Sequence, residues 1–487
     1  MQHYSGARLT TPPTHHLAPK FSRTRGCPFA GDAPSANVNP SSCRLTRIGL
    51  PRHPGGALPR MVHGLRLKRF TIENFKALGN VDVSVADDLL FLIGVNGAGK
   101  SSILQALSLV RYFAEGSTSN FFKDRGWNSA DARPKTIHVP PLRAAGADTK
   151  KSLSRNLGIS LAFESDGIDL VWSFQWGYAR ERTVRESVWV QGRGSSAPRR
   201  LIGYPAAPNE EGPVAALFRV GRLDLPGSLM ALFRPESFQL SDGESQAIDA
   251  LREWATGITS LELLNPSTMR NRLRGDGNDI GPQGERLASF LAELKPDAKD
   301  RVVDRMRKFY PIKDLDTTRK RAGWIDMQVA EAFRMMGRVD AAHMSDGFLR
   351  ILALCAIPEF GPEASLVLLD EVEDGIEPHI LPSLIERIAA EASSQLFMTS
   401  HSPLLINFFE QSQIYLLGRD KNGQTIGSEV SELEPFRHGG EYLGNGEIWA
   451  NASAESVYAS LPKWHAPRRA ISDALSPNEI SQFLRGK

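Results

Sequence analysis

The sequence contains Gly94-Val95-Asn96-Gly97-Ala98-Gly99-Lys100-Ser101-Ser102, which fits the pattern G-x-x-x-x-G-K-[ST] of a phosphate-binding loop. A continuous apolar run, Leu89–Ile93, comes directly before it, as expected for a strand that is buried on both faces. Apolar residues at helical spacing follow it, namely Ile103, Leu104, Leu107 and Val110. In this order of strand, glycine-rich loop and helix, backbone N–H groups and the helix N-terminus can bind phosphates.

The residue types in this loop predict a nucleotide site. Lys100 is expected to reach the β- and γ-phosphates, and the Ser101 hydroxyl is expected to hold Mg²⁺. A glycine-rich turn that carries a lysine by chance is disfavoured because both flanks fit. The predicted ATP-binding residues of the loop are Gly94, Asn96, Gly97, Ala98, Gly99, Lys100, Ser101 and Ser102.

A second apolar run, Leu366–Leu369, ends in Asp370-Glu371, which is the Walker B pattern. Asp370 is expected to hold Mg²⁺ at the carboxyl end of the strand, where ligands bind in open α/β sheets. Glu371 is the predicted catalytic residue that polarises the water attacking a γ-phosphate. The alternative is a buried strand with exposed acids at its end, which the phosphate-binding loop in the same chain makes the weaker interpretation.

Two further motifs surround this strand. Ser345-Asp346-Gly347 precedes an apolar helix that ends at Pro358, and taken alone it is only a helix cap with a small residue. The predicted strand Leu396–Thr399 is followed by His401, which at that edge of the sheet can reach a γ-phosphate. Between them, Pro378 is predicted to open a core helix whose apolar face is Ile380, Leu381, Leu384, Ile385 and Ile388.

The other elements are predicted from periodicity. Alternating apolar residues indicate strands at 65–72 and 81–85, with Asn74-Phe75-Lys76 in the turn between them, and a strand pair at 158–163 and 170–176. Helical spacing indicates helices at 247–264 and 286–294. Residues 276–279 hint at a calcium loop, but apolar residues occupy its ligand positions, so a turn is predicted there.

Charge is unevenly distributed along the 487 residues, whose formal net charge is +3. Residues 1–60 contain seven Arg and Lys20 against Asp32 alone, a formal charge of +7, which leaves −4 for the rest of the chain. This proline-rich segment has no helical or strand periodicity, and we predict that it is disordered. We interpret Met61, which directly precedes the first predicted strand, as the natural start. His15-His16 is interpreted as a solvated pair rather than a metal site.

The cysteines and the apolar runs indicate in which cellular compartment the protein is expected. Cys27, Cys43 and Cys355 form neither a disulfide framework nor a paired metal knuckle, so a reducing cytoplasm fits best. The longest apolar stretch, Leu349–Ile357, is too short to span a bilayer. We therefore expect no membrane partner.

In chain order the motifs are NFK at 74–76, GVNGAGKSS at 94–102, MSDGFLR at 344–350, LVLLDEVEDGIEPH at 366–379 and TSHSP at 399–403. This series resembles the ABC-type ATPase heads of RecF, SMC and OLD proteins, and more narrowly the stand-alone bacterial AAA family ATPases. The resemblance covers Leu65 to about Leu417. It departs from the family at Val372 and Glu377, where Pro and His are common, and Gln175 is only a weak candidate for a Q-loop glutamine.

The resemblance implies that two heads pair with two ATP molecules between them. Ser345 and Gly347 would then contact the γ-phosphate bound by the partner, His401 would be the switch histidine, and Lys76 would lie near the nucleotide. The implied fold is an α/β P-loop NTPase, an ABC-type head with a mixed sheet, an antiparallel β subdomain and a helical insert. The predicted domains are an extension at 1–62, an ATPase domain at 63–455 with an insert at about 115–330, and a tail at 456–487.

Three functions compete. The first is a cytoplasmic, ATP-driven dimer switch, with ATP and Mg²⁺ as cofactors, that controls a separate nuclease or other effector in phage defence or DNA processing. The second is the ATPase subunit of a transporter, which the absence of an LSGGQ signature and the long interval between loop and signature disfavour. The third is an ATP-binding scaffold, which the complete set of Asp370, Glu371 and His401 disfavours.

Nucleic acid is a candidate partner on weaker grounds. Basic residues cluster between the predicted helices and could form one face: Arg301, Arg305, Arg307, Lys308, Arg319, Lys320 and Arg321. Solvated helix faces explain such a cluster better, and the negative charge of the body gives nucleic-acid binding no support.

A truncation tests the interpretation of residues 1–60. A chain that begins at Met61 is expected to match the full chain in expression, melting temperature and ATPase rate, because the removed segment contributes nothing to a core. A clear loss of folding or of activity in the shortened protein would show that the extension belongs to the functional protein.

Overall fold

The structure of the chain is a computed structural model. It describes residues 64–135, 156–165, 167–192, 197–205, 225–231, 240–262, 264–271, 279–320, 323–333, 337–439, 444–451, 455, 459, 461 and 477–485. The predictions for residues 1–62, Met61, His15-His16, Cys27, Cys43 and residues 276–278 lie outside these described residues. Cys355 is a buried free cysteine.

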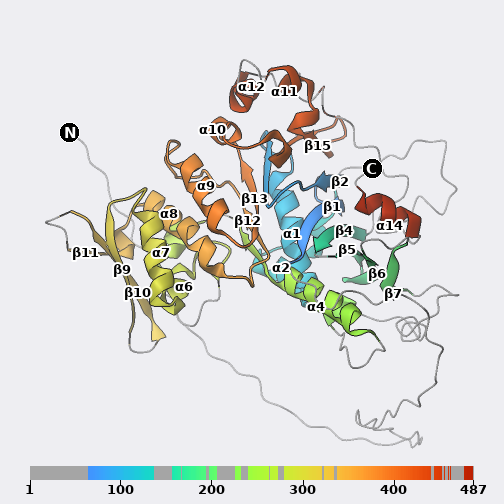
Figure 1. The fold of residues 1–487 in the computed structure, drawn as a ribbon, viewed down its shortest axis with the longest axis horizontal. Helices are drawn as coiled ribbons and strands as arrows, with labels where there is room; N and C mark the ends of the chain where they lie inside the picture. The colour runs from blue at the N-terminus through green and yellow to red at the C-terminus, as the bar shows by residue number, and fades with distance from the viewer. Residues whose placement is uncertain are drawn as a thin grey trace, which may run out of the picture. The chain divides into compact units, whose positions relative to one another are not determined.

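The central sheet contains the predicted nucleotide-binding strand. Its order is β15-β14-β3-β13-β12-β8, and all neighbours are parallel except β14 and β15 (Figure 1). The strand β13 thus lies between the strand of the phosphate-binding loop and the Walker B strand. The strands are β3 (Leu89–Gly94), β8 (Ile258–Leu261), β12 (Leu366–Leu369), β13 (Gln395–Ser400), β14 (Ile414–Arg419) and β15 (Thr425–Glu429).

A second, fully antiparallel sheet has the order β2-β1-β4-β5-β6-β7. The predicted insert therefore contributes four strands that extend the first hairpin, whose turn is Lys76-Ala77. The strands are β1 (Arg66–Phe75), β2 (Leu78–Ser84), β4 (Asn156–Ser165), β5 (Ile168–Gly177), β6 (Arg182–Gly192) and β7 (Arg199–Tyr204).

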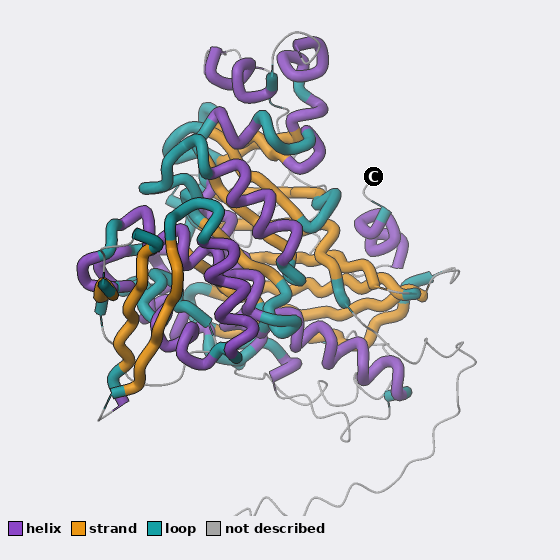
Figure 2. Tube along the Cα trace, turned by 60° about the vertical axis from the view of Figure 1, so that its left-hand side comes forward, coloured by secondary structure: helices purple, strands orange, loops and turns teal. Residues whose placement is uncertain are grey.

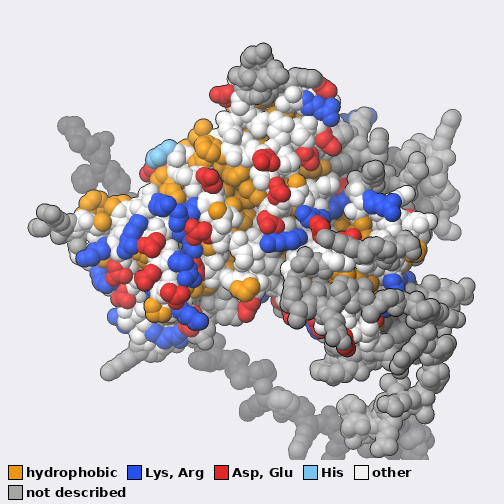
Figure 3. Space-filling view, viewed as in Figure 1, with side chains coloured by type: hydrophobic (Ala, Val, Ile, Leu, Met, Phe, Trp, Pro, Cys, Tyr) orange, Lys and Arg blue, Asp and Glu red, His pale blue; other side chains and the backbone are white. Residues whose placement is uncertain are grey.

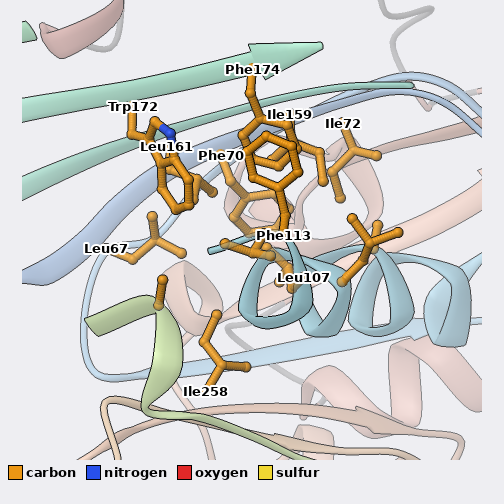
Figure 4. Packing of buried hydrophobic residues seen from close by; sticks show 14 of the residues in the cluster. Leu67, Phe70, Ile72, Leu107, Phe113, Ile159, Leu161, Trp172, Phe174 and Ile258 are labelled. Atoms are coloured by element: carbon orange, nitrogen blue, oxygen red, sulfur yellow. The ribbon is translucent and has the colours of Figure 1, made fainter. Parts of the chain in front are cut away.

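Helix α1 (Lys100–Ala114) lies between the two large sheets and packs against both. Leu67, Phe70 and Leu161 from the antiparallel sheet meet Leu107 of this helix in one core (Figure 4). The rings of Phe113 and Phe174 stack at 3.8 Å between centroids. The helices α2 (Thr118–Asp124) and α4 (Asp242–Thr256) extend this layer.

The other face of the central sheet is covered by a second core. Leu89, Phe91 and Ile93 of β3 face this core, whereas Leu90 and Leu92 face α1, so β3 is buried on both faces as predicted. The helices of this layer include α5 (Pro266–Met269), α6 (Leu287–Glu293), α7 (Pro296–Met306), α8 (Asp346–Ala356) and α9 (Leu381–Glu391).

A three-stranded sheet, ordered β11-β10-β9, packs one face on α6 and α7 at the side of this layer (Figure 2). Towards the C-terminus, short helices follow the central sheet, and α14 covers the antiparallel sheet through Ile480 and Phe483. These elements are β9 (Ile312–Arg319), β10 (Ile325–Glu331), β11 (Arg338–Asp340), α10 (Pro403–Ile406), α11 (Glu434–Gly439), α12 (Asn445–Asn451) and α14 (Pro477–Leu484).

Two predicted helix boundaries are wrong. The helix predicted at 247–264 ends at Thr256, and after Gly257 the chain forms β8, which pairs with β12 at the edge of the central sheet. The helix predicted to open at Pro378 begins at Leu381, because residues 378–380 form a turn and Pro382 takes the early helical position. Its buried face, Leu381, Leu384, Ile385 and Ile388, is core as predicted.

The described part of the chain contains no helix that combines the length and the apolar composition needed to cross a bilayer. In the antiparallel sheet, the side chain of Glu186 on β6 has no exposed surface. It accepts hydrogen bonds from Trp172 Nε1 (2.9 Å), Ser228 Oγ (2.6 Å) and the Leu229 N–H (2.7 Å). Glu186 therefore ties the segment Leu225–Ala231 to the sheet. Burial raises the pKa of Glu186 to about 7, although these three hydrogen bonds oppose the shift.

This carboxyl group makes stability depend on pH. Its native pKa lies above the ordinary value of 4.5, so its contribution to the free energy of unfolding is complete below about pH 4.5 and is lost as pH rises through 7. Glu186→Gln should lower stability by about 1–3 kcal/mol by mispairing the Leu229 N–H, and should flatten this decline. Thermal melts between pH 4.5 and pH 8, with Glu164→Gln on β4 as control, check this expectation. An unchanged slope in Glu186→Gln would exclude this group as its source.

Candidate active site

The phosphate-binding loop connects β3 to α1 and depends on its glycines. A Cβ on Gly94 would lie 2.3 Å from the Leu417 carbonyl oxygen, and a Cβ on Gly99 would lie 2.3 Å from Thr425 Oγ1. Both glycines also have positive φ, 145° and 107°, which other residues rarely adopt. The tip of the loop, residues 95–97, is exposed, whereas Ala98, Gly99 and Lys100 are buried. The site residues predicted from Gly94 to Ser102 thus form one loop and the first turn of α1.

Lys100 folds back over this loop. Its Nζ donates to the carbonyl oxygens of Gly94 (2.9 Å) and Val95 (3.3 Å), and its side chain is largely buried. Burial lowers the pKa of Lys100, while the carboxylates of Asp370, Glu371 and Glu373 act in the opposite direction. The ammonium group is therefore held at the loop tip, close to the acids that follow β12.

Asp370 links the end of β12 to β13 and to the start of α1. Its Oδ1 accepts hydrogen bonds from Ser101 Oγ (3.0 Å) at the start of α1 and from Thr399 Oγ1 (2.6 Å) on β13. Burial raises the pKa of Asp370, and the two hydrogen bonds and Lys100 counteract that rise. The hydroxyl and the carboxylate are oxygen ligands of the kind that Mg²⁺ prefers, and they are already in contact. Ser101 and Asp370 therefore fit a magnesium site that phosphate oxygens would complete.

Glu371 has a strained backbone and an exposed side chain. Its φ is +50°, which for a residue with a Cβ costs about 1–2 kcal/mol. The Glu371 N–H donates to Thr399 Oγ1 (2.8 Å), and the next N–H, from Val372, donates to the Thr399 carbonyl (3.2 Å). Thr399 thus fixes both Walker B acids. Thr399 is absent from the predicted site residues, although it belongs to the motif TSHSP.

His401 follows β13 on the same edge of the sheet and is partly exposed. Its backbone N–H donates to Glu373 Oε1. The other oxygen, Glu373 Oε2, is buried and has no hydrogen-bond partner among the described residues. Glu373 therefore positions the turn at His401. The carboxylate of Glu371 is exposed and does not hold that turn.

The signature motif begins α8. Ser345 is exposed, and its Oγ accepts a hydrogen bond from the Phe348 N–H (3.2 Å), so it caps the helix. No hydrogen bond among the described residues joins Ser345 to the phosphate-binding loop of its own chain. Instead, α8 packs on the loop that follows β12. A Cβ on Gly347 would lie 2.9 Å from the Gly375 carbonyl oxygen, and Arg350 Nη2 lies 2.6 Å from Asp374 Oδ2.

Lys76 lies in the first hairpin turn, and its side chain is held by α1 and by Trp127. Its Nζ donates to Gln105 Oε1 on α1 (2.8 Å) and lies 3.7 Å from the centroid of the Trp127 ring. Burial, with help from Arg125, lowers the pKa of Lys76 to about 8. Its assignment as a nucleotide contact therefore stays a prediction. Gln175, the weak Q-loop candidate, is buried in β5 opposite Arg185 and Gly158.

The predicted basic face is largely neutralised. Arg301 and Arg305 both pair with Glu359, and the nearly buried Arg305 also pairs with Glu391. Further along, Arg307 pairs with Asp304 and Arg319 with Glu293, and Figure 3 shows basic and acidic side chains intermixed over this region. Arg321 lies outside the described residues. The interpretation as solvated, paired charges fits better than a nucleic-acid surface.

Comparison with known protein families gives two matches. Residues 66–153 match an "AAA ATPase domain", and residues 233–407 match an "AAA domain, putative AbiEii toxin, Type IV TA system". The first match contains the phosphate-binding loop, and the second contains the signature, the Walker B strand and His401. A comparison with curated proteins finds no match.

Among solved structures, the chain is similar to a Smc head bound to the C-winged helix domain of ScpA, with 13% identity and a TM-score of 0.43, over 75% of this chain and 98% of that one. It is also similar to the SMC head domain from Thermotoga maritima, with 13% identity and a TM-score of 0.40, over 75% and 99%. A Smc head with an extended coiled coil from Pyrococcus furiosus gives 12% identity and a TM-score of 0.43, over 75% and 97%.

The geometry and the family matches agree on the nature of this site. The loop between β3 and α1, the acids after β12 and the histidine after β13 lie on one edge of the central sheet, beside an antiparallel sheet that packs on α1. Residues 66–153 and 233–407 are similar to AAA-type ATPase domains, and these two segments contain the loop, the acids and the histidine of this edge.

Proposed function

We propose that this chain binds ATP with Mg²⁺, hydrolyses it, and uses the bound ATP to switch between separate and paired heads. The observation that carries this proposal is the hydrogen-bonded set of Ser101, Asp370 and Thr399 at the loop, with the exposed carboxylate of Glu371 next to it. These residues combine a phosphate site, ligands for a divalent cation and a base.

The proposed reaction is attack of water on the γ-phosphate of ATP. Glu371 accepts a proton from the attacking water, the bond between the γ-phosphorus and the bridging oxygen breaks, and ADP leaves with that oxygen. Lys100 neutralises phosphate charge from the loop tip. Ser101 and Asp370 would hold Mg²⁺, which supplies further charge neutralisation when bound. His401 is proposed as the γ-phosphate sensor, because Glu373 fixes its backbone beside Glu371.

The proposed switch depends on the start of α8. Ser345 and Gly347 lie at the N-terminus of an 11-residue helix, where N–H groups and the helix dipole favour an anion. Ser345 is exposed and is not hydrogen-bonded to its own loop, which supports a contact with the γ-phosphate held by a second copy. ATP between two surfaces would then convert binding energy into association energy.

The proposed output is control of a separate effector, with a nuclease as the first candidate, in phage defence or DNA processing. Residues 233–407 match a domain whose description names a toxin of a type IV toxin–antitoxin system. This match supports the proposed link to an effector. We propose a cytoplasmic homodimer, or a higher homo-oligomer, as the active form. Nucleic acid stays a weaker candidate partner, because the basic residues near α7 are paired.

Substitutions in the loop and at the base test the chemistry. Lys100→Ala should lose nucleotide affinity because phosphate charge is left unneutralised. Glu371→Gln should bind ATP but turn it over at least ~10²-fold more slowly, the usual scale for loss of a general base. Glu373→Gln is the matched control, because its amide oxygen can still accept the His401 N–H. Phosphate-release assays and nucleotide titrations check both, and normal turnover in Glu371→Gln would move the base elsewhere.

A second pair of variants tests the shared site. Glu371→Gln protein is expected to associate more strongly with ATP than with ADP, because ATP persists in it. Adding Ser345→Arg should abolish this association, since the larger side chain fills the anion site, while ATP binding by the single chain stays nearly intact. Analytical ultracentrifugation and nucleotide titration measure the two effects separately. A loss of binding in proportion to the loss of assembly would place Ser345 in the pocket of its own chain.

A further inference from the structure

The β14–β15 hairpin contacts the phosphate-binding loop at three of its glycines. The Leu417 carbonyl lies against Gly94, the Thr425 side chain lies against Gly99, and the Nε–H of Arg419 donates to the Gly97 carbonyl. These residues are more than 300 positions from the loop in sequence, and β14 reaches it by pairing in parallel with β3. The hairpin therefore forms a second wall of the loop, for which no motif in the sequence assigns a role.

Arg419 has unused hydrogen-bonding capacity at this wall. The residue is exposed, and its Nη2 lies 3.9 Å from the position that a Cβ on Gly97 would take. Within the described part of the chain, only the Nε–H of Arg419 has a hydrogen-bond partner. Its Nη1 and Nη2 form neither a hydrogen bond nor an ion pair with these described residues. A guanidinium held by one edge thus presents its other N–H groups at the exposed tip of the loop.

The loop tip is where the terminal phosphates should lie. Lys100 Nζ is bound to the carbonyls of Gly94 and Val95 at this tip, and the motif directs that lysine to the β- and γ-phosphates. Gly97 is two residues beyond Val95 on the same exposed turn. Around Lys100 lie the carboxylates of Asp370, Glu371 and Glu373, so a second protein cation, besides Mg²⁺, would help to balance the charge of a triphosphate.

We propose that Arg419 is a phosphate-binding residue that contacts the terminal phosphates of a nucleoside triphosphate through Nη1 and Nη2. This inference rests on the proposed ATP site and adds a second cation to it. The planar guanidinium matches two phosphate oxygens, and its Nε bond to Gly97 fixes its direction before the ligand arrives. Thr425 Oγ1 gives an independent indication, because this almost fully buried hydroxyl beside Gly99 has no hydrogen-bond partner in the described chain.

The opposing interpretation is that Arg419 only clamps the loop. A clamp would shape the loop equally for every nucleotide and would contribute to the stability of the fold. A phosphate contact would instead distinguish ATP from ADP, would depend on the positive charge, and would weaken as salt screens the exposed guanidinium. These differences separate the two roles.

The test uses the full chain with Glu371→Gln, so that ATP persists, and titrates ATP and ADP with Mg²⁺ by calorimetry at two salt concentrations. Arg419→Ala should weaken ATP binding by about tenfold or more and ADP binding by less than about threefold, and should reduce the salt dependence for ATP. Arg419→Lys should lie between, because it keeps the charge and loses the fork. Lys421→Ala, an exposed cation on the same hairpin, is the matched control and should leave both affinities unchanged.

Each other outcome overturns the inference. Equal losses for ATP and ADP together with a lower melting temperature would make Arg419 a clamp of the loop. Unchanged affinities in Arg419→Ala, with a parent that binds ATP, would refute the phosphate contact and leave the proposed ATP site intact. A parent protein that binds neither nucleotide would refute the ATP site itself, and this inference with it.

Discussion

The site depends on the carboxyl group of Asp370, which is largely shielded from water. Burial raises the pKa of this carboxyl group, and hydrogen bonds from Ser101 and Thr399 offset the cost of desolvation. The two hydroxyls reach it because β3, β13 and β12 are adjacent and parallel, so their carboxyl ends meet at one edge. The order of three buried strands thus determines whether a metal-binding acid can exist at this position.

The register of β13 also determines which side chains reach this site. Along β13, Phe397 faces the core around α1, whereas Leu396 and Met398 face the opposite core. By this alternation Thr399 lies on the α1 side, the side from which Ser101 reaches Asp370. A register slip of one residue would turn Thr399 away and would also bury polar atoms in the wrong core. The apolar residues that stabilise the sheet therefore also position the edge that carries the proposed site.

Local patterns explain what could be predicted from the sequence. The loop, its strand and helix, the Walker B acids and the signature cap are all encoded within short segments, and the structure has these elements at the predicted places. The predicted helix at 247–264 was wrong because Ile258 and Leu261 of β8 continue the helical spacing of Ala247, Leu251 and Trp254. Edge pairing with β12 overrode that periodicity, and only the three-dimensional partner of the segment reveals it.

The residues that the sequence did not reveal act across long separations in the chain. Thr399 is 29 positions from Asp370, and Arg350 meets Asp374 between the signature helix and the loop after β12. This second contact has a mechanical consequence. Gly347 lies so close to the Gly375 carbonyl that a methyl group would approach it to 2.9 Å, and on the same helix Arg350 is paired with Asp374. Because close-packed groups resist sliding, a force on the exposed start of α8 is transmitted to the loop that begins with Glu371. Helix α8 and the loop after β12 are therefore joined through this short contact inside one chain.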